Sequence, residues 1–262
     1  MSRFCLATII AAAGVVALAL LVRGPGRWWA MGGVALVYLA AVGLGVSWIR
    51  LGFFVPAICR GEEGANRVAL TFDDGPDAEA TPRLLDLLKQ QRVPATFFCV
   101  GERAAAHPDL IRRMAAEGHS IGNHTFRHAW WTNFLFGRWL RDEIRRAQEA
   151  LRGILGRAPR FFRSPAGLTN PHLGRPLREL GLVLVGWDVR PFDRGADPDR
   201  VAERVCRRAR DGSIIVLHDG GVGAEALVRT AAAVIAALRE RGYAFASLDE
   251  LLAARGERKE LG

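Results

Sequence analysis

The chain has 262 residues and a formal net charge of +9, a length that allows one sizeable α/β domain and an appendage. Positive charge could indicate nucleic acid, but the arginines flank apolar segments or are scattered through helical stretches, so we expect no nucleic acid and predict no protein partner. The four cysteines show no paired spacing and identify no redox compartment.

Two long apolar runs open the chain, at residues 4–22 and 29–49. Neither contains a charge, and each is about as long as the ~20 residues that a bilayer-spanning helix needs. A short turn with two arginines separates them, so residues 1–57 are predicted to form a transmembrane helical hairpin and a short tether. A cleavable signal peptide is the alternative for the first run, but the run exceeds the usual ~7–15 residues and no small-residue cleavage site follows.

Strand-like and helix-like patterns alternate beyond residue 57. About seven such units predict a parallel sheet with helices outside, closed or nearly closed into a barrel over residues 58–255, and a charged tail at 256–262. The expected strands are 67–72, 95–100, 119–123, 160–163, 182–187, 213–217 and 243–247. The expected helices are 81–91, 108–117, 139–155, 171–180, 198–209 and 224–241.

Polar side chains gather where these strands end. In parallel barrels, active sites are built at the carboxyl ends of the strands. The residues that fall there are Asp73, Asp74, His124, Arg163, Asp188, Asp193, His218 and Asp219.

Two motifs among them indicate a metal site. Residues 71–76 read Thr-Phe-Asp-Asp-Gly-Pro, and residues 124–128 read His-Thr-Phe-Arg-His, which we expect to place two imidazoles on one face of a helical turn. Each motif alone is a weak signal. Together, with a third histidine at another strand end, they predict a set of two histidines and one carboxylate that leaves a coordination position for water.

Acid–base roles follow from the remaining groups. Asp73 is placed to act as the base, and His218 is the best candidate for the acid. Arg163 can pair with the base, and Asp193 or Asp188 can orient a histidine ring. Zinc is the expected cofactor, with cobalt or nickel as alternatives, because such sites accept several metals.

The motifs resemble those of the NodB-homology polysaccharide deacetylases, carbohydrate esterase family 4, from about Arg67 to Leu252. Besides the two motifs above, residues 163–167 (Arg-Ser-Pro-Ala-Gly) are similar to the family's RxPYG motif, and residues 215–219 to its closing LH motif. The resemblance implies a distorted barrel of about seven strands and metal-dependent removal of N-acetyl groups from amino sugars.

The resemblance also implies residue roles. It implies that Asp73 is the base, that His218 is the acid and that Leu217 lines the acetyl pocket. It places the backbone N–H that follows Pro165, that of Ala166, at the developing oxyanion. The implied metal ligands are Asp74, His124 and His128.

Two positions depart from the family pattern. Ala166 stands where tyrosine is usual. The stretch from Trp187 keeps the usual aspartate at Asp193, but Arg194 replaces the tryptophan that follows it. The catalytic set is therefore expected to be whole, while Ala166 and Arg194 predict an altered pocket. The expected substrate-binding positions are Ala166, Leu217, Trp187 and Arg194.

The expected protein is a membrane-anchored deacetylase of a polysaccharide or cell-envelope glycan in the bacterial inner membrane. The resemblance places its catalytic domain in the periplasm or outside the cell. A deacetylase or deformylase of a lipid-linked sugar is the alternative, and an inactive carbohydrate-binding protein is the alternative of another class. The aromatic stretch at 129–139 is expected to form a sugar-stacking wall or packed cap, or a loop that dips into lipid headgroups.

Overall fold

The computed structural model describes residues 2–129 and 137–253, in which strands and helices alternate beyond residue 60. The helices are α1 (Arg3–Leu21), α2 (Gly26–Ser47), α3 (Ala80–Gln91), α4 (Gly101–Ala106), α5 (Pro108–Ala116), α6 (Gly137–Leu155), α7 (Gly174–Glu179), α8 (Pro198–Arg208), α9 (Ala224–Glu240) and the 3-10 turns η1 (Ile49–Leu51) and η3 (Pro165–Gly167). The strands are β1 (Arg67–Asp73), β2 (Ala95–Cys99), β3 (Ser120–Asn123), β4 (Phe161–Phe162), β5 (Val183–Leu184), β6 (Ile214–His218) and β7 (Ala244–Phe245).

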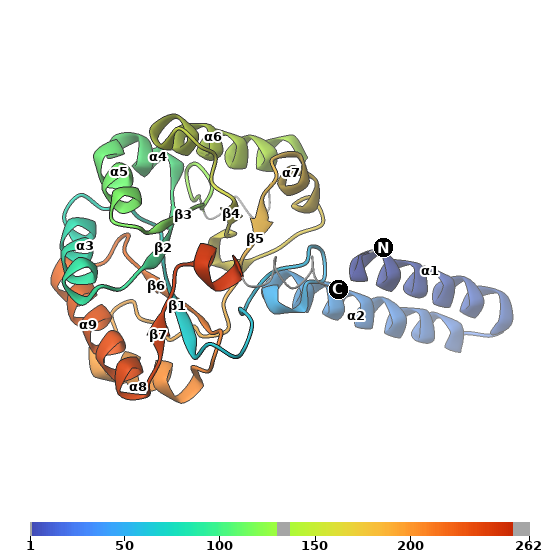
Figure 1. The fold of residues 1–262 in the computed structure, drawn as a ribbon. Coiled ribbons are helices and arrows are strands. Elements are labelled where there is room, and N and C mark those ends of the chain that lie inside the picture. Colours follow the sequence, from blue (N-terminus) through green and yellow to red (C-terminus); the bar gives the residue numbers. More distant parts are fainter. Residues whose placement is uncertain (1, 130–136, 254–262) are drawn as a thin grey trace.

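A wholly parallel sheet forms the centre of the larger part of the molecule, with helices around it (Figure 1). Its order is β5-β4-β3-β2-β1-β6, and β7 pairs with β1. Just beyond β5, Val189 forms a parallel bridge with Ile215 of β6 and so joins the two edges. The predicted distorted, nearly closed barrel is therefore confirmed.

The alternation of side chains along β1 explains how one face of this strand carries polar groups while the other is apolar. Side chains of a strand point to opposite faces in turn. Leu70 and Phe72 belong to the main apolar core, which includes residues of the outer helices. Ala69 belongs to a second apolar cluster, and the next side chains on its face, Thr71 and Asp73, both accept hydrogen bonds from a buried arginine.

Several predicted boundaries are wrong. The strands β4, β5 and β7 are two residues long. Beyond β4 and β5 the chain turns into the loops that carry Ala166 and Trp187 of the cavity wall. The helix expected from Pro171 begins at Gly174, because Asn170 Oδ1 accepts the His172 N–H in a local turn that competes with the helix. The short α4 has no apolar period and was not predicted.

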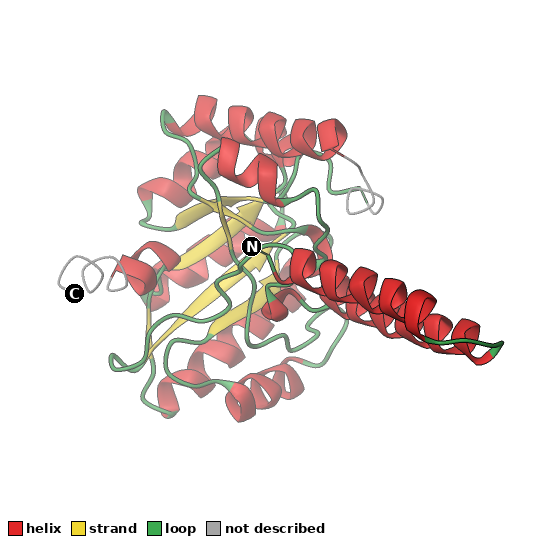
Figure 2. Ribbon diagram, turned by 90° about the vertical axis from the view of Figure 1, so that its right-hand side faces the viewer, coloured by secondary structure: helices red, strands yellow, loops and turns green. Residues whose placement is uncertain are grey.

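The two apolar runs form α1 and α2, which lie side by side and project from the barrel as a rod (Figures 1 and 2). Their 19 and 22 residues are long enough and apolar enough to cross a membrane. Gly45 is the one residue of these two described helices that is buried. Ile49, just beyond α2, is buried in a cluster of barrel residues, so the division at residue 57 stays a prediction, and the tail at 256–262 lies outside the described residues.

Candidate metal centre and active site

The two adjacent carboxylates leave β1 in different directions. Asp73 ends the strand and lies opposite His218 of β6 in the sheet register. Asp74 has a φ of 75°, a conformation that aspartate tolerates better than most residues. As a result Asp73 reaches Arg163 in the barrel interior, while Asp74 reaches His124 and His128.

The expectation that the two histidines share a helical turn is wrong. Residues 124–129 contain no helix, and Thr125 and His128 have φ values of 65° and 52°. The Thr125 N–H donates to Asn123 Oδ1 at 2.9 Å, and the His128 N–H donates to Thr125 Oγ1 at 3.2 Å. This tight loop, held by side-chain hydrogen bonds, brings the rings of His124 and His128 to 4.8 Å between centroids.

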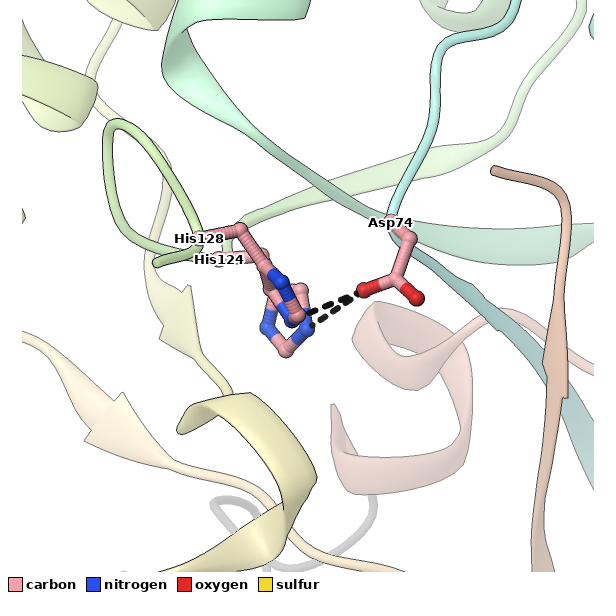
Figure 3. A group of neighbouring side chains, drawn as sticks. All are labelled: Asp74, His124 and His128. Carbon is pink, nitrogen blue, oxygen red and sulfur yellow. Dashed lines mark ion pairs between the residues drawn. The ribbon is translucent and has the colours of Figure 1, made fainter. Parts of the chain in front are cut away.

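The donor atoms of this group converge on one point (Figure 3). Asp74 Oδ1 lies 3.2 Å from His124 Nε2 and 3.0 Å from His128 Nε2, and one donor atom of each residue lies within 4.8 Å of the others. His124 Nδ1 lies 2.7 Å from the carbonyl oxygen of Arg163. A proton on Nδ1 donated to that carbonyl leaves Nε2 with a free lone pair, so the residues fit a divalent metal.

The two neighbouring histidines keep the Asp74 carboxylate ionised. Burial alone raises the pKa of Asp74, but hydrogen bonds from His124 and His128 hold it well below its ordinary value. Burial opposes a charge on His124, yet the neighbouring Asp73 and Asp74 raise its pKa. An ionised carboxylate beside two imidazoles is a donor set that zinc and similar ions prefer.

Asp73 forms an ion pair with a fully buried arginine, Arg163. Arg163 Nη1 donates to Asp73 Oδ1 at 2.7 Å and to Thr71 Oγ1 at 2.7 Å. Arg163 Nη2 donates to the Gly186 carbonyl at 2.9 Å, and its guanidinium carbon lies 4.0 Å from the centroid of the Phe98 ring. This ion pair between buried side chains fixes the Asp73 carboxylate in place.

Asp193, and not Asp188, contacts His218. His218 Nδ1 lies 2.8 Å from Asp193 Oδ1, and the His218 N–H donates to Asp193 Oδ2 at 2.9 Å. Asp188 instead accepts hydrogen bonds from Ser213 Oγ and the Ile214 N–H, both at 2.8 Å. The sequence left open whether Asp193 or Asp188 orients a histidine ring, and these contacts favour Asp193.

One cavity of about 370 Å³ is lined by Asp73, Asp74, His124, His128 and His218. Ala166, with a φ of 55°, and Trp187 form part of its wall. The Trp187 ring packs on Gly167, where a Cβ atom would come within 2.4 Å of it. Leu217, expected beside the acetyl group, lines a neighbouring cavity of about 270 Å³, whereas Val216 lines the cavity of about 370 Å³.

Two arginines contact Asp74. Arg194 forms an ion pair with Asp74 Oδ2, on the side away from the histidines. Arg103 donates from Nη1 to the Asp74 carbonyl at 2.6 Å and also lines the cavity. Sequence reasoning missed Arg103, although its place just beyond the carboxyl end of β2 is the signal that could have found it. The aromatic residues 130–136 lie outside the described residues.

A third carboxyl group lies under the site. Asp219 is fully buried and accepts hydrogen bonds from the Gly75 N–H at 3.1 Å and from Thr81 Oγ1 at 2.8 Å. Burial raises the pKa of Asp219 to about 7, and the nearby charges of Asp74 and Asp73 add to the effect. This group therefore makes stability depend on pH.

Asp219→Asn is expected to flatten the pH dependence of stability of the metal-free chain. The pKa of about 7 lies above the ordinary 3.8, so the folded state keeps a proton that the unfolded state releases. The free energy of unfolding then falls as pH rises through this window, by on the order of a few kcal/mol. Thermal unfolding with chelator at about pH 5 and about pH 8 measures this. An equal difference in Tm between parent and variant at both pH values would contradict it.

Comparison with known proteins identifies the family. A family model described as polysaccharide deacetylase matches residues 60–185. The chain is 38% identical over 202 residues to a chitooligosaccharide deacetylase of Bradyrhizobium sp. (strain ANU 289), covering 72% of this chain and 91% of the relative. It is 36% identical over 189 residues to a peptidoglycan-N-acetylglucosamine deacetylase of Bacillus cereus, covering 71% and 87%.

A solved structure agrees with these relatives. The Bc1960 peptidoglycan N-acetylglucosamine deacetylase superimposes with a TM-score of 0.70 at 34% identity, covering 74% of this chain and 92% of that one. Fold, motifs and relatives together define a carbohydrate deacetylase. The chain belongs to the polysaccharide deacetylase family, the NodB-homology group of carbohydrate esterase family 4.

Proposed function

We propose that the chain is a membrane-anchored, metal-dependent hydrolase that removes N-acetyl groups from amino sugars of a polysaccharide or another cell-envelope glycan. The observation that carries this proposal is the convergence of Asp74, His124 and His128 in the cavity that Asp73 and His218 also line. The relatives are named as deacetylases of chitooligosaccharides and of peptidoglycan, which supports an amino-sugar polymer.

The three ligand residues would hold one divalent ion. Zinc suits two imidazoles and a carboxylate, and cobalt or nickel suits them as well. When bound, such an ion supplies Lewis-acid polarisation of the acetamide carbonyl and lowers the pKa of a water molecule. Asp74 would bind through Oδ1, which faces both histidines, while Arg194 holds Oδ2.

The remaining residues move the protons. Asp73 takes a proton from the attacking water at Oδ2, since Oδ1 is held by Arg163. The Ala166 amide would donate to the oxyanion. His218 gives a proton from Nε2 to the leaving nitrogen, because Asp193 holds its Nδ1–H. Water and the acetamide become acetate and a free amine.

His218→Ala is expected to slow amide cleavage much more than ester cleavage. An activated ester has a good leaving group that departs without a proton, so it depends less on the acid. The measurement is kcat on an acetylated chitooligosaccharide and on an aryl acetate, with metal content determined for each preparation. Equal losses on the two substrates would contradict the role of His218.

The hairpin supports an anchor in a membrane. The family resemblance is what favours the bacterial inner membrane, with the catalytic domain in the periplasm or outside the cell. A deacetylase or deformylase of a lipid-linked sugar remains the alternative substrate class. An inactive carbohydrate-binding protein is disfavoured, since the metal group, Asp73 and His218 are all present in one cavity.

The test is acetate release. The full chain, purified in detergent and supplied with zinc, is incubated with acetylated chitooligosaccharides and peptidoglycan fragments. We expect acetate from at least one of them, lost after chelation and restored by metal. Binding of these glycans without acetate release under any metal would overturn the proposal in favour of the binding protein.

A further inference from the structure

The catalytic cavity carries more positive charge than a neutral sugar requires. Among the described residues that line it are three arginines, Arg103, Arg190 and Arg194, against the two carboxylates of Asp73 and Asp74. Both carboxylates already have cationic partners. A divalent ion would add to the positive charge, and such a cavity attracts an anionic ligand.

Arg190 is a preorganised cation in this cavity. Its guanidinium carbon lies 5.3 Å from the centroid of the Trp187 ring and 5.1 Å from that of Phe192. In the part of the chain that the structure describes, no carboxylate forms an ion pair with it. Stacking restrains the guanidinium plane and leaves its N–H donors free at the edge, the arrangement that binds phosphate or carboxylate through paired hydrogen bonds.

Hydrogen bonds join the same cavity wall to the hairpin. The Thr169 N–H donates to the Val46 carbonyl at 3.0 Å, and Thr169 Oγ1 donates to the Gly45 carbonyl at 2.9 Å. Thr169 follows Ala166 of the cavity wall by three residues. The carbonyl end of α2 therefore meets the barrel at the loop that follows β4.

A second contact joins the hairpin to the segment that carries Arg190. Ile49, just beyond α2, is buried and packs on Gly186, where a Cβ atom would lie 3.0 Å from its side chain. Gly186 directly precedes Trp187, on which Arg190 stacks. If α1 and α2 span a bilayer, these contacts hold this rim of the cavity near the membrane surface.

We propose that Arg190, with Arg194 in the same cavity, binds a phosphoryl group, and that the substrate is an N-acylated amino sugar joined through phosphate to a membrane lipid. The proposal rests on the proposed function, because it keeps the hydrolysis of the N-acyl group in the same cavity, and it takes as substrate the lipid-linked sugar that stood there as the alternative. A sugar that carries a carboxylate would also present an anionic group to Arg190. Phosphate is favoured because the hairpin meets the barrel at this rim of the cavity. A lipid joined to its sugar through phosphate would present that sugar there if α1 and α2 span the bilayer.

The first test is binding, which needs no turnover. Calorimetry on the zinc-loaded full chain in detergent compares N-acetylglucosamine, its 1-phosphate and N-acetylmuramic acid. We expect the 1-phosphate to bind tighter than the neutral sugar by about tenfold or more, and Arg190→Gln to remove most of that difference. Arg190→Lys should keep part of it, because the charge stays while the paired donors are lost.

A matched control is available on the opposite rim. Arg160 stacks on Phe161 at 5.4 Å but is exposed at the amino end of β4. Arg160→Gln should keep the full preference for the phosphorylated sugar. Equal affinity for both sugars in the parent chain, or an unchanged preference in Arg190→Gln, would overturn the phosphoryl site. Tighter binding of N-acetylmuramic acid than of the 1-phosphate would assign the arginine to a carboxylate and overturn it as well.

The second test separates a lipid-linked substrate from a free sugar phosphate. The 1-phosphate esterified to a short prenyl chain is offered in the same micelles, and we expect both tighter binding and a higher kcat/KM than for the free 1-phosphate. No gain from the prenyl chain would reject the lipid-linked substrate. Selective binding without release of the acyl group from any substrate would refute the proposed function while the anion site stands.

Discussion

Asp73→Asn is expected to lower kcat by roughly 10²–10⁴-fold while metal content stays unchanged. Asparagine has nearly the shape of aspartate and keeps an oxygen for Arg163 Nη1, which lies 2.7 Å from Asp73 Oδ1. It accepts no proton, so the attacking water loses its base. Asp74, which would hold the metal, is not altered.

The measurement is acetate release together with metal analysis of the same preparation. Asp188→Asn serves as a control, since Asp188 is also a carboxylate with a buried side chain but bonds to Ser213 and Ile214 instead of facing the cavity. It should keep most of the activity. A variant at Asp73 with normal kcat and normal metal content would show that another group is the base.

Local sequence could predict the position of Asp73 because a strand has a period of two. The run of buried residues in β1 ends in a polar residue, and the parallel arrangement places that end beside His218. The same reasoning put His124 and Arg163 at the same rim. The fold class and the position of most candidate catalytic residues follow from such local patterns and strand order.

The loops were less predictable because their contacts join distant segments. His124 and His128 meet through a turn with two positive φ values, which the four-residue spacing does not distinguish from a helix. The pairing of Arg194 with Asp74 spans 120 residues. The contact of Ile49 with Gly186 likewise depends on how the hairpin docks on the barrel. No local period encodes these contacts.

Asp74→Ala, His124→Ala and His128→Ala are each expected to abolish activity and to weaken metal binding strongly, because each removes one of three protein ligands. The loss of metal affinity should be larger for His124→Ala than for His128→Ala. The His124 side chain is 2% exposed and its Nδ1 is fixed by the Arg163 carbonyl, whereas the His128 side chain is 33% exposed. A preoriented ligand contributes more to affinity than a mobile one.

Metal content after dialysis and the rise in Tm on adding zinc report binding without any assay of turnover, since an ion bound to the folded state raises Tm. The exposed His172 provides the control, and His172→Ala should keep full metal content and the full rise in Tm. Asp73→Asn should behave like that control in binding and like the ligand variants in activity. Full metal occupancy in all three ligand variants would end the assignment of this site, because no other group of three histidine, cysteine or acidic residues in the described chain could hold the ion.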